Sequence, residues 1–165
     1  MDVKKWCEAL ELIPHPEGGF YRQTEKHSQK IEANGRSRAL YTSIYFLLTE
    51  ESPSHFHRLK SDEIWYFHHG ESLTVHCLHP DGSYEAIHLG LDIAAGERLH
   101  AVVPAGTIFA SSVPKDAALV SCLVAPGFDF ADFELFTQAE LLTDYPAYEE
   151  IILNYAYEEI PCTFT

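Results

Sequence analysis

The stretch HFHRLKSDEIWYFHHG, residues 55–70, places two histidines one residue apart, then an acidic pair, then a glycine behind an aromatic run. Side chains alternate between the two faces of a β-strand, so His55 and His57 are expected on the same face. A hairpin through the turn RLKSD would bring the strand EIWYF back alongside and turn Glu63 toward the two histidines. The stretch therefore predicts a pocket wall made of two imidazoles and a carboxylate.

This trio is compatible with two kinds of chemistry. Two neutral imidazoles and a carboxylate can hold a divalent ion such as Fe, Mn, Ni or Zn and leave coordination positions open for a substrate. Without a metal, the same groups can serve as base, acid and orienting group in proton transfer. Both interpretations stay open at the level of these residues.

The rest of the chain predicts a mainly β fold. Short segments rich in Tyr, Phe, Val and Ile alternate with turn residues at intervals of roughly ten residues, without helices between them. This spacing is typical of an antiparallel sandwich or barrel. The predicted strands are FYRQTE, ALYTSIYFLL, SHFH, EIWYF, SLTVHCLH, YEAIHLG, LHAVV, TIFASS and ALVSCLV, whereas HHGE is predicted to form a turn that contains His68 and His69.

Helices are expected only near the two ends. Val3, Trp6, Leu10 and Ile13 are spaced like one face of a short N-terminal helix. Residues 140–155 have helical spacing that is interrupted at Pro146, which predicts one or two C-terminal helices. No repeat or linker divides the chain, so residues 1–165 are expected to form one domain.

Charge and composition argue against several classes of binding partner. The formal net charge of -14 would repel nucleic acid and anionic membranes. No apolar run is long enough to span a bilayer, and the first ten residues lack the apolar core of a signal peptide, so a cytoplasmic protein is expected. The four cysteines are scattered and form no C-x-x-C pair. Phosphate-loop, dinucleotide-binding and serine-hydrolase motifs are absent.

The 55–70 stretch also resembles the first sequence motif of the cupins, with His55, His57, Glu63 and Gly70 at the motif positions and one extra residue before Glu63. The segment PAGTIFASS is similar to the second cupin motif, but the position of its histidine ligand holds Phe109. The resemblance implies a jelly-roll β-barrel. It also implies that a metal would be weakly held by His55, His57 and Glu63 alone, so no cofactor is expected.

Over most of its length the chain resembles one uncharacterised cupin-like family, through HPEGGFYRQTE, the region 43–73, VPAGTIFASS and APGFDFADFEL. This resemblance implies an internal pocket, a homodimer and a shape similar to the deoxysugar-nucleotide epimerases, which use a histidine base and a tyrosine acid without metal. In this family the first histidine position accepts other residues, which favours His57 over His55. The tyrosine is left open among Tyr21, Tyr41, Tyr45 and Tyr66.

Other residues are candidates for ligand binding. Arg22 could pair with an anionic group of a substrate, and His55 could contact a ligand without holding a metal. Trp65, Phe67 and Phe109 could form an aromatic wall for a sugar-like molecule. Glu63 would be costly to bury unless it is paired or protonated, which makes it a functional candidate together with His57.

Three functions follow from these observations. The first is a metal-independent isomerase or epimerase-like enzyme that acts on a small polar, carbohydrate-like metabolite through His57 and Glu63. The second is a barrel that binds or senses a small molecule without changing it. The third is a metal-dependent dioxygenase or isomerase with an incomplete His-His-Glu site.

Overall fold

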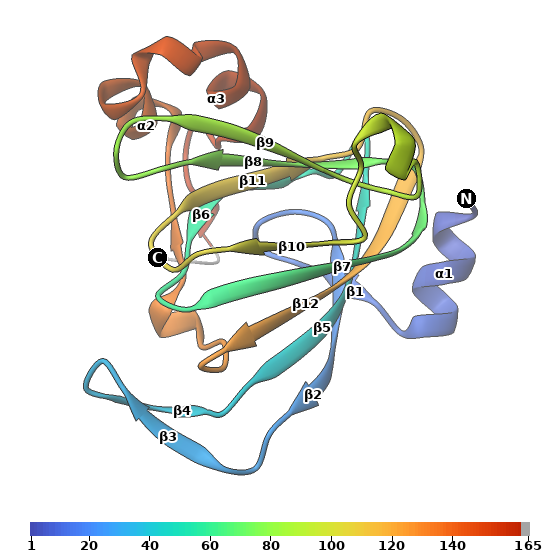
Figure 1. Cartoon of the computed structure of the whole chain (residues 1–165), viewed down its shortest axis with the longest axis vertical. Coiled ribbons are helices and arrows are strands. Elements are labelled where there is room, and N and C mark those ends of the chain that lie inside the picture. The colour runs from blue at the N-terminus through green and yellow to red at the C-terminus, as the bar shows by residue number, and fades with distance from the viewer. Residues whose placement is uncertain (163–165) are drawn as a thin grey trace.

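The computed structural model describes residues 1–162, so the last three residues of the predicted domain lie outside the described range. Two antiparallel β-sheets face each other and form a barrel-like jelly roll (Figure 1). The predicted class, mainly β with helices near the ends, is confirmed. The larger sheet has the strand order β1 (Ile13–Pro14), β2 (Phe20–Lys26), β5 (Thr42–Thr49), β12 (Ala117–Ala125), β7 (Asp62–Gly70) and β10 (His100–Val103).

The smaller sheet packs over the larger one. Its strand order is β13 (Glu134–Leu135), β6 (Ser54–Arg58), β11 (Ile108–Ser112), β8 (Leu73–Leu78) and β9 (Tyr84–Leu89). A separate hairpin of β3 (Lys30–Ala33) and β4 (Arg36–Ala39) extends from one end of the barrel (Figure 1). Each of the nine predicted segments contains a strand, whereas β1, β3, β4 and β13 were not predicted.

Three α-helices lie outside the sheets: α1 (Val3–Leu10), α2 (Gln138–Asp144) and α3 (Glu149–Tyr155). Asp2 caps α1 by accepting a hydrogen bond from the backbone N–H of Lys5. Thr137 and Glu140 form a capping box at the start of α2. Three short 3-10 helices complete the fold: η1 (Ile93–Ala95), η2 (Phe130–Asp132) and η3 (Pro146–Tyr148). No helix in the described part of the chain is long and apolar enough to cross a membrane.

Two local predictions were wrong. The N-terminal helix does not reach Ile13, because Glu11 adopts a left-handed conformation that ends α1, and Ile13 then pairs with Tyr21 as part of β1. The predicted turn at 68–71 begins too early, because β7 continues to Gly70. His68 and His69 therefore lie on a strand, exposed to solvent. Pairing with β12 holds these last residues extended despite their polar character.

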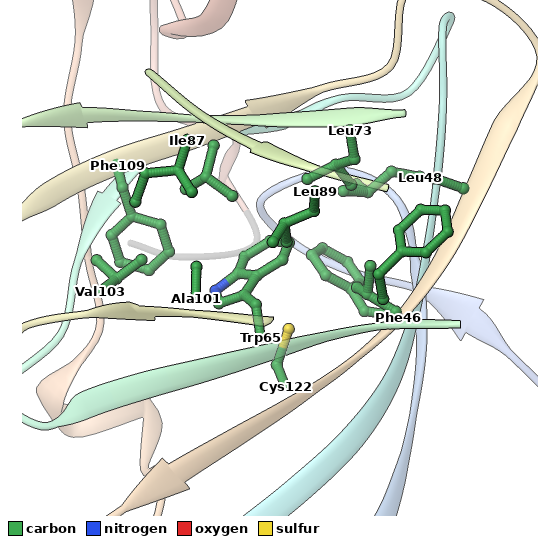
Figure 2. Packing of buried hydrophobic residues seen from close by; sticks show 14 of the residues in the cluster. Phe46, Leu48, Trp65, Leu73, Ile87, Leu89, Ala101, Val103, Phe109 and Cys122 are labelled. Carbon is green, nitrogen blue, oxygen red and sulfur yellow. The ribbon is translucent and has the colours of Figure 1, made fainter. Parts of the chain in front are cut away.

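The core lies between the two sheets. Trp65 is fully buried and contacts the rings of Phe46 and Phe109 in edge-to-face geometry, with centroid separations of 6.0 and 6.4 Å. Figure 2 shows Trp65 and Phe46 from the larger sheet meeting Leu73, Ile87 and Leu89 from the smaller one. Along β7 the buried residues are Glu63, Trp65 and Phe67, which is the alternation predicted from the sequence. The inward face of β7 thus carries both core residues and one carboxyl group.

Candidate functional site

An enclosed cavity of about 230 Å³ lies between the sheets and is partly covered by the segment that follows β12. Four strands of the larger sheet contribute to its wall, together with β6 of the smaller sheet and the turn between β1 and β2. The lining residues are His15, Glu17, Tyr21, Gln23, Thr42, Ile44, His57, Leu59, Glu63, Cys122, Val124, Phe128 and Phe130.

The turn after β1 brings Glu17 into this cavity. The turn is closed by backbone hydrogen bonds from His15 N–H to the Gly19 carbonyl and from Gly18 N–H to the His15 carbonyl. Gly18 has a φ of 107°, and a side chain there would overlap the backbone of Pro53. A glycine at position 18 therefore lets the turn lie against the chain just before β6. This placement buries the side chain of Glu17, which is 6% exposed.

Glu17 and His57 lie next to each other in the cavity wall. The Nδ1 atom of His57 lies 2.7 Å from the backbone carbonyl of His55, which can only accept, so Nδ1 carries a proton. The Nε2 atom lies 3.2 Å from Oε2 of Glu17, and Oε1 of Glu17 accepts a hydrogen bond from the Ser54 hydroxyl at 2.9 Å. The carboxyl group next to His57 is therefore that of Glu17 and not that of Glu63.

Burial determines the charge of this pair. It lowers the pKa of His57 to about 4, so the imidazole is neutral at pH 7 and its Nε2 atom accepts. Burial, reinforced by the nearby Glu63, raises the pKa of Glu17 well above its ordinary value of 4.5. Burial also lowers the pKa of His15, another cavity residue, to about 3.

Glu63 is the second buried carboxyl group of the cavity. Its Oε2 atom is buried and has no hydrogen-bond partner among the described residues. Burial raises its pKa to about 7, and the neighbouring Trp65 and Cys122 side chains partly oppose this increase. Near neutral pH, Glu63 is therefore present in both its acid and its carboxylate form.

Of the residues expected at the site, His57 and Glu63 line the cavity and His55 does not. The His55 ring stacks on Tyr157 at a centroid distance of 3.8 Å, and its Nδ1 atom lies 2.8 Å from the Glu17 carbonyl. Arg22 also lies away from the cavity, because its guanidinium pairs with Glu11 at 2.7 Å on the surface. Strand alternation predicted that His55 and His57 lie side by side at the pocket. In the structure, His55 instead contacts the turn that carries Glu17 and does not line the cavity.

The aromatic residues that line the cavity differ from those predicted from the sequence. Trp65, Phe67 and Phe109 are buried in the core and do not line the cavity, although Phe109 packs on the His57 ring at 4.1 Å. The aromatic side chains at the cavity are Tyr21, Phe128 and Phe130. Tyr21 is therefore the one tyrosine, among the four left open by the sequence, that faces the cavity.

The residues expected to hold a metal do not fit that role. His55 is held away by Tyr157 and the Glu17 carbonyl, and Phe109 supplies no ligand atom. The Nε2 atom of His57 already faces a carboxyl group. Within residues 1–162, no group of three or more His, Cys, Asp or Glu side chains is arranged to hold a metal ion. No step is therefore assigned to a metal.

His15, Glu17 and Cys122 line the cavity, and this was not predicted from the sequence for any of them. The available signal was an acidic residue directly before two glycines, in HPEGG, because a tight turn can bury the residue that precedes it. The sequence gives no comparable signal for Cys122, whose inward position depends on the pairing of β12 with β7.

His76 is a buried histidine outside the cavity. Its two ring nitrogens each lie 2.8 Å from a hydroxyl, one from Tyr84 and the other from Ser112. Burial lowers its pKa to about 4. Because it is neutral and buried like His57 but does not line the cavity, it is a suitable control position for tests of His57.

Comparison with known proteins places the chain among cupins. The model of a family described as cupin superfamily (DUF985) matches residues 4–136. An uncharacterised yeast protein, YML079W of Saccharomyces cerevisiae, is 34% identical over 139 residues, with 74% of this chain and 69% of the yeast protein covered. These relatives support the fold and carry no established reaction.

Solved structures show the same architecture. Protein SO0799 from Shewanella oneidensis is 46% identical, with a TM-score of 0.90 over 96% of this chain and 99% of that one. A hypothetical protein from Leishmania major is 42% identical, with the same TM-score over 94% and 99% of the two chains. Oxalate decarboxylase from Bacillus subtilis, at 16% identity and a TM-score of 0.57 over 90% of this chain and 38% of its own, shares the fold alone.

Proposed function

Because this chain belongs to the cupin superfamily, in the family described as DUF985, we propose that its barrel binds a small uncharged polar molecule and transfers a proton on it. The observation that carries this proposal is the carboxyl group of Glu63, a residue that lines the cavity and whose pKa is raised by burial to about 7. A carboxyl group with this pKa can take up or release a proton near neutral pH.

The size of the cavity supports a small ligand. Its volume of about 230 Å³ corresponds to about eight water molecules at roughly 30 Å³ each. Pockets for drug-sized ligands occupy about 300–1,000 Å³, so the ligand is of monosaccharide size or smaller. A nucleotide-linked sugar would not fit within this enclosed volume.

The charge of the cavity supports an uncharged ligand. Among the described residues, none of those lining the cavity is a lysine or arginine, and Arg22 lies on the surface. Burial keeps His57 neutral and raises the pKa of Glu17, so the cavity offers no fixed positive charge to an anion. Hydroxyl and carbonyl groups of a polyol, aldose or ketose can bond to Glu63, Tyr21 and Gln23 instead.

The proposed chemistry is proton transfer beside a carbonyl group. The carboxylate form of Glu63 takes a proton from carbon as the C–H bond breaks, and the electron pair moves toward the carbonyl oxygen. The Tyr21 hydroxyl donates a proton to that oxygen. Glu63 then returns the proton to the neighbouring carbon, while the hydroxyl group on that carbon gives its proton to the Tyr21 oxygen and becomes the new carbonyl group, which completes an isomerisation. His57 lies in the opposite wall of the cavity, on β6, and orients the ligand.

Deuterium exchange tests this proposal. The protein is incubated in D₂O with a panel of neutral aldoses and ketoses of three to six carbons, and incorporation of deuterium beside the carbonyl is followed by proton NMR. We expect exchange with at least one sugar and a loss of about 100-fold or more in Glu63→Gln, the usual size of an acid-base contribution. His57→Gln should also lower the rate, whereas His76→Gln, the matched control, should retain it.

A second candidate function is binding without chemistry. It is favoured by the position of Glu17, whose Oε2 atom lies 3.2 Å from His57 Nε2 and so takes the place where a ligand would approach that nitrogen. Native mass spectrometry of freshly purified protein distinguishes the two. A retained ligand without deuterium exchange would support the binding function, and neither a ligand nor exchange would contradict both.

A further inference from the structure

The segment 127–133, called the cover here, closes one side of the cavity. It follows β12 and includes η2, and it belongs to neither of the two main sheets. Phe128 and Phe130 project from it into the cavity wall, with their rings 5.0 Å apart. Phe130 is nevertheless 48% exposed, so one part of its ring faces the cavity and another faces solvent. A large apolar side chain in this position acts as the outer wall of the cavity.

The cover is tied to the β3–β4 hairpin by one carboxylate. Asp132 accepts hydrogen bonds from Arg38 Nε at 2.7 Å and from Arg36 Nη1 at 2.5 Å. Arg36 also donates to the Ala131 carbonyl at 3.1 Å. The Asp132 and Arg38 side chains are only 11% and 12% exposed, so this is a partly buried, charge-assisted contact rather than a solvated surface pair. The hairpin thus holds the cover where it lies.

The wall beneath the cover is thin. An open groove outside the barrel is lined by Leu59, Asp132 and Phe133, and Leu59 also lines the inner cavity. A void of about 10 Å³, roughly the space for one water molecule, shares Leu59 and Asp132 with the groove and Leu59 and Phe128 with the cavity. A small outward movement of the cover would therefore join the cavity to the groove.

We propose that the cover is a gate and that the contacts of Asp132 with Arg36 and Arg38 are its latch. In the closed state Phe128 and Phe130 cover one side of the cavity. When the latch breaks, the cover moves away from Leu59 and a ligand passes between the groove and the cavity. The proposal concerns access alone, so it holds whether the cavity performs proton transfer or only binds a ligand.

Cysteine labelling measures this access without a ligand. Cys122 lines the cavity, and Cys77 is buried in the same core cluster without lining it. The folded protein is treated with iodoacetamide, and the labelling rate of each cysteine is resolved by mass spectrometry. In Asp132→Asn we expect Cys122 to be labelled about tenfold faster than in the parent protein, with the rate at Cys77 unchanged. Arg58→Gln, which breaks the Arg58–Glu134 pair in the same groove, is the matched control and should leave both rates unchanged.

Salt provides a test without substitution. Raising NaCl from 50 to 500 mM screens the contact of Asp132 with Arg36, whose side chain is 39% exposed, so it should accelerate labelling of Cys122 in the parent protein and have little effect in Asp132→Asn. Equal Cys122 rates in the parent protein and in Asp132→Asn would overturn the proposal. A parallel increase at Cys77 and Cys122 would also overturn it, because it would indicate loosening of the whole barrel.

Discussion

The parent protein is expected to lose stability through Glu63 as the pH rises from about 4.5 to 7, and this loss is expected to be absent in Glu63→Gln. Burial raises the pKa of Glu63 from 4.5 to about 7, so the unfolded chain releases this proton at lower pH than the folded protein does. The stability contributed by the protonated form is complete below pH 4.5 and is lost as the pH rises toward 7. The shift corresponds to about 3 kcal/mol of unfolding free energy.

Urea unfolding at a series of pH values from 4 to 8 measures this effect. The free energy of the variant relative to the parent should increase by about 3 kcal/mol across the range, whatever constant offset the amide introduces. His57→Gln provides a control of opposite sign. Burial lowers the pKa of His57 to about 4, so its contribution is present above pH 6.5 and is lost as the pH falls toward 4. A Glu63→Gln difference that does not vary with pH would contradict the prediction.

Gly18→Ala is expected to destabilise the protein by roughly 3 kcal/mol and to displace Glu17 from the cavity. Part of this cost is the positive φ of 107°, and part is overlap between the new methyl group and the Pro53 carbonyl oxygen. Because the same turn carries His15 and Glu17, relief of the overlap would move both side chains. The contact of Glu17 with His57 and the hydrogen bond that the Ser54 hydroxyl donates to Glu17 should then be lost.

Gly82→Ala is the matched control for this substitution. Gly82 also has a positive φ, 87°, but no atom lies within 4 Å of the position that a methyl group would occupy. The substitution Gly82→Ala should therefore lower the free energy of unfolding only by the backbone strain, about 1 kcal/mol. Urea unfolding measures both variants, and NMR of the His57 ring reports whether the contact with Glu17 persists. Equal destabilisation by the two substitutions would show that the contact of Gly18 with Pro53 is unimportant.

Much of the fold could be predicted from local patterns. Alternation in EIWYF placed Glu63, Trp65 and Phe67 on the buried face of β7, and this was confirmed because β7 is covered on one face only. The N-terminal helix was predicted too long, since apolar spacing does not reveal the left-handed residue at Glu11 that ends it. The strands β3 and β4 were missed because residues 30–39 are largely polar and pair only with each other.

The site was less predictable than the fold. His57 and Glu63 were identified because both lie on strands within one motif, and the same motif suggested His55, Trp65 and Phe67. Whether an inward side chain meets a cavity or fills the core depends on its depth in the barrel. Alternation gives the face of a side chain but not this depth.

By itself, the sequence determined that the chain forms an antiparallel barrel with His57 and Glu63 on inward positions, because strand alternation and turn residues act over short distances along the chain. Only the tertiary structure decided which groups surround them. The turn at 15–19 brings Glu17 to His57, and the segment after β12 brings Phe128 and Phe130 over the cavity. The resulting shifts in pKa come from burial between segments far apart in the sequence, and no local pattern encodes that burial.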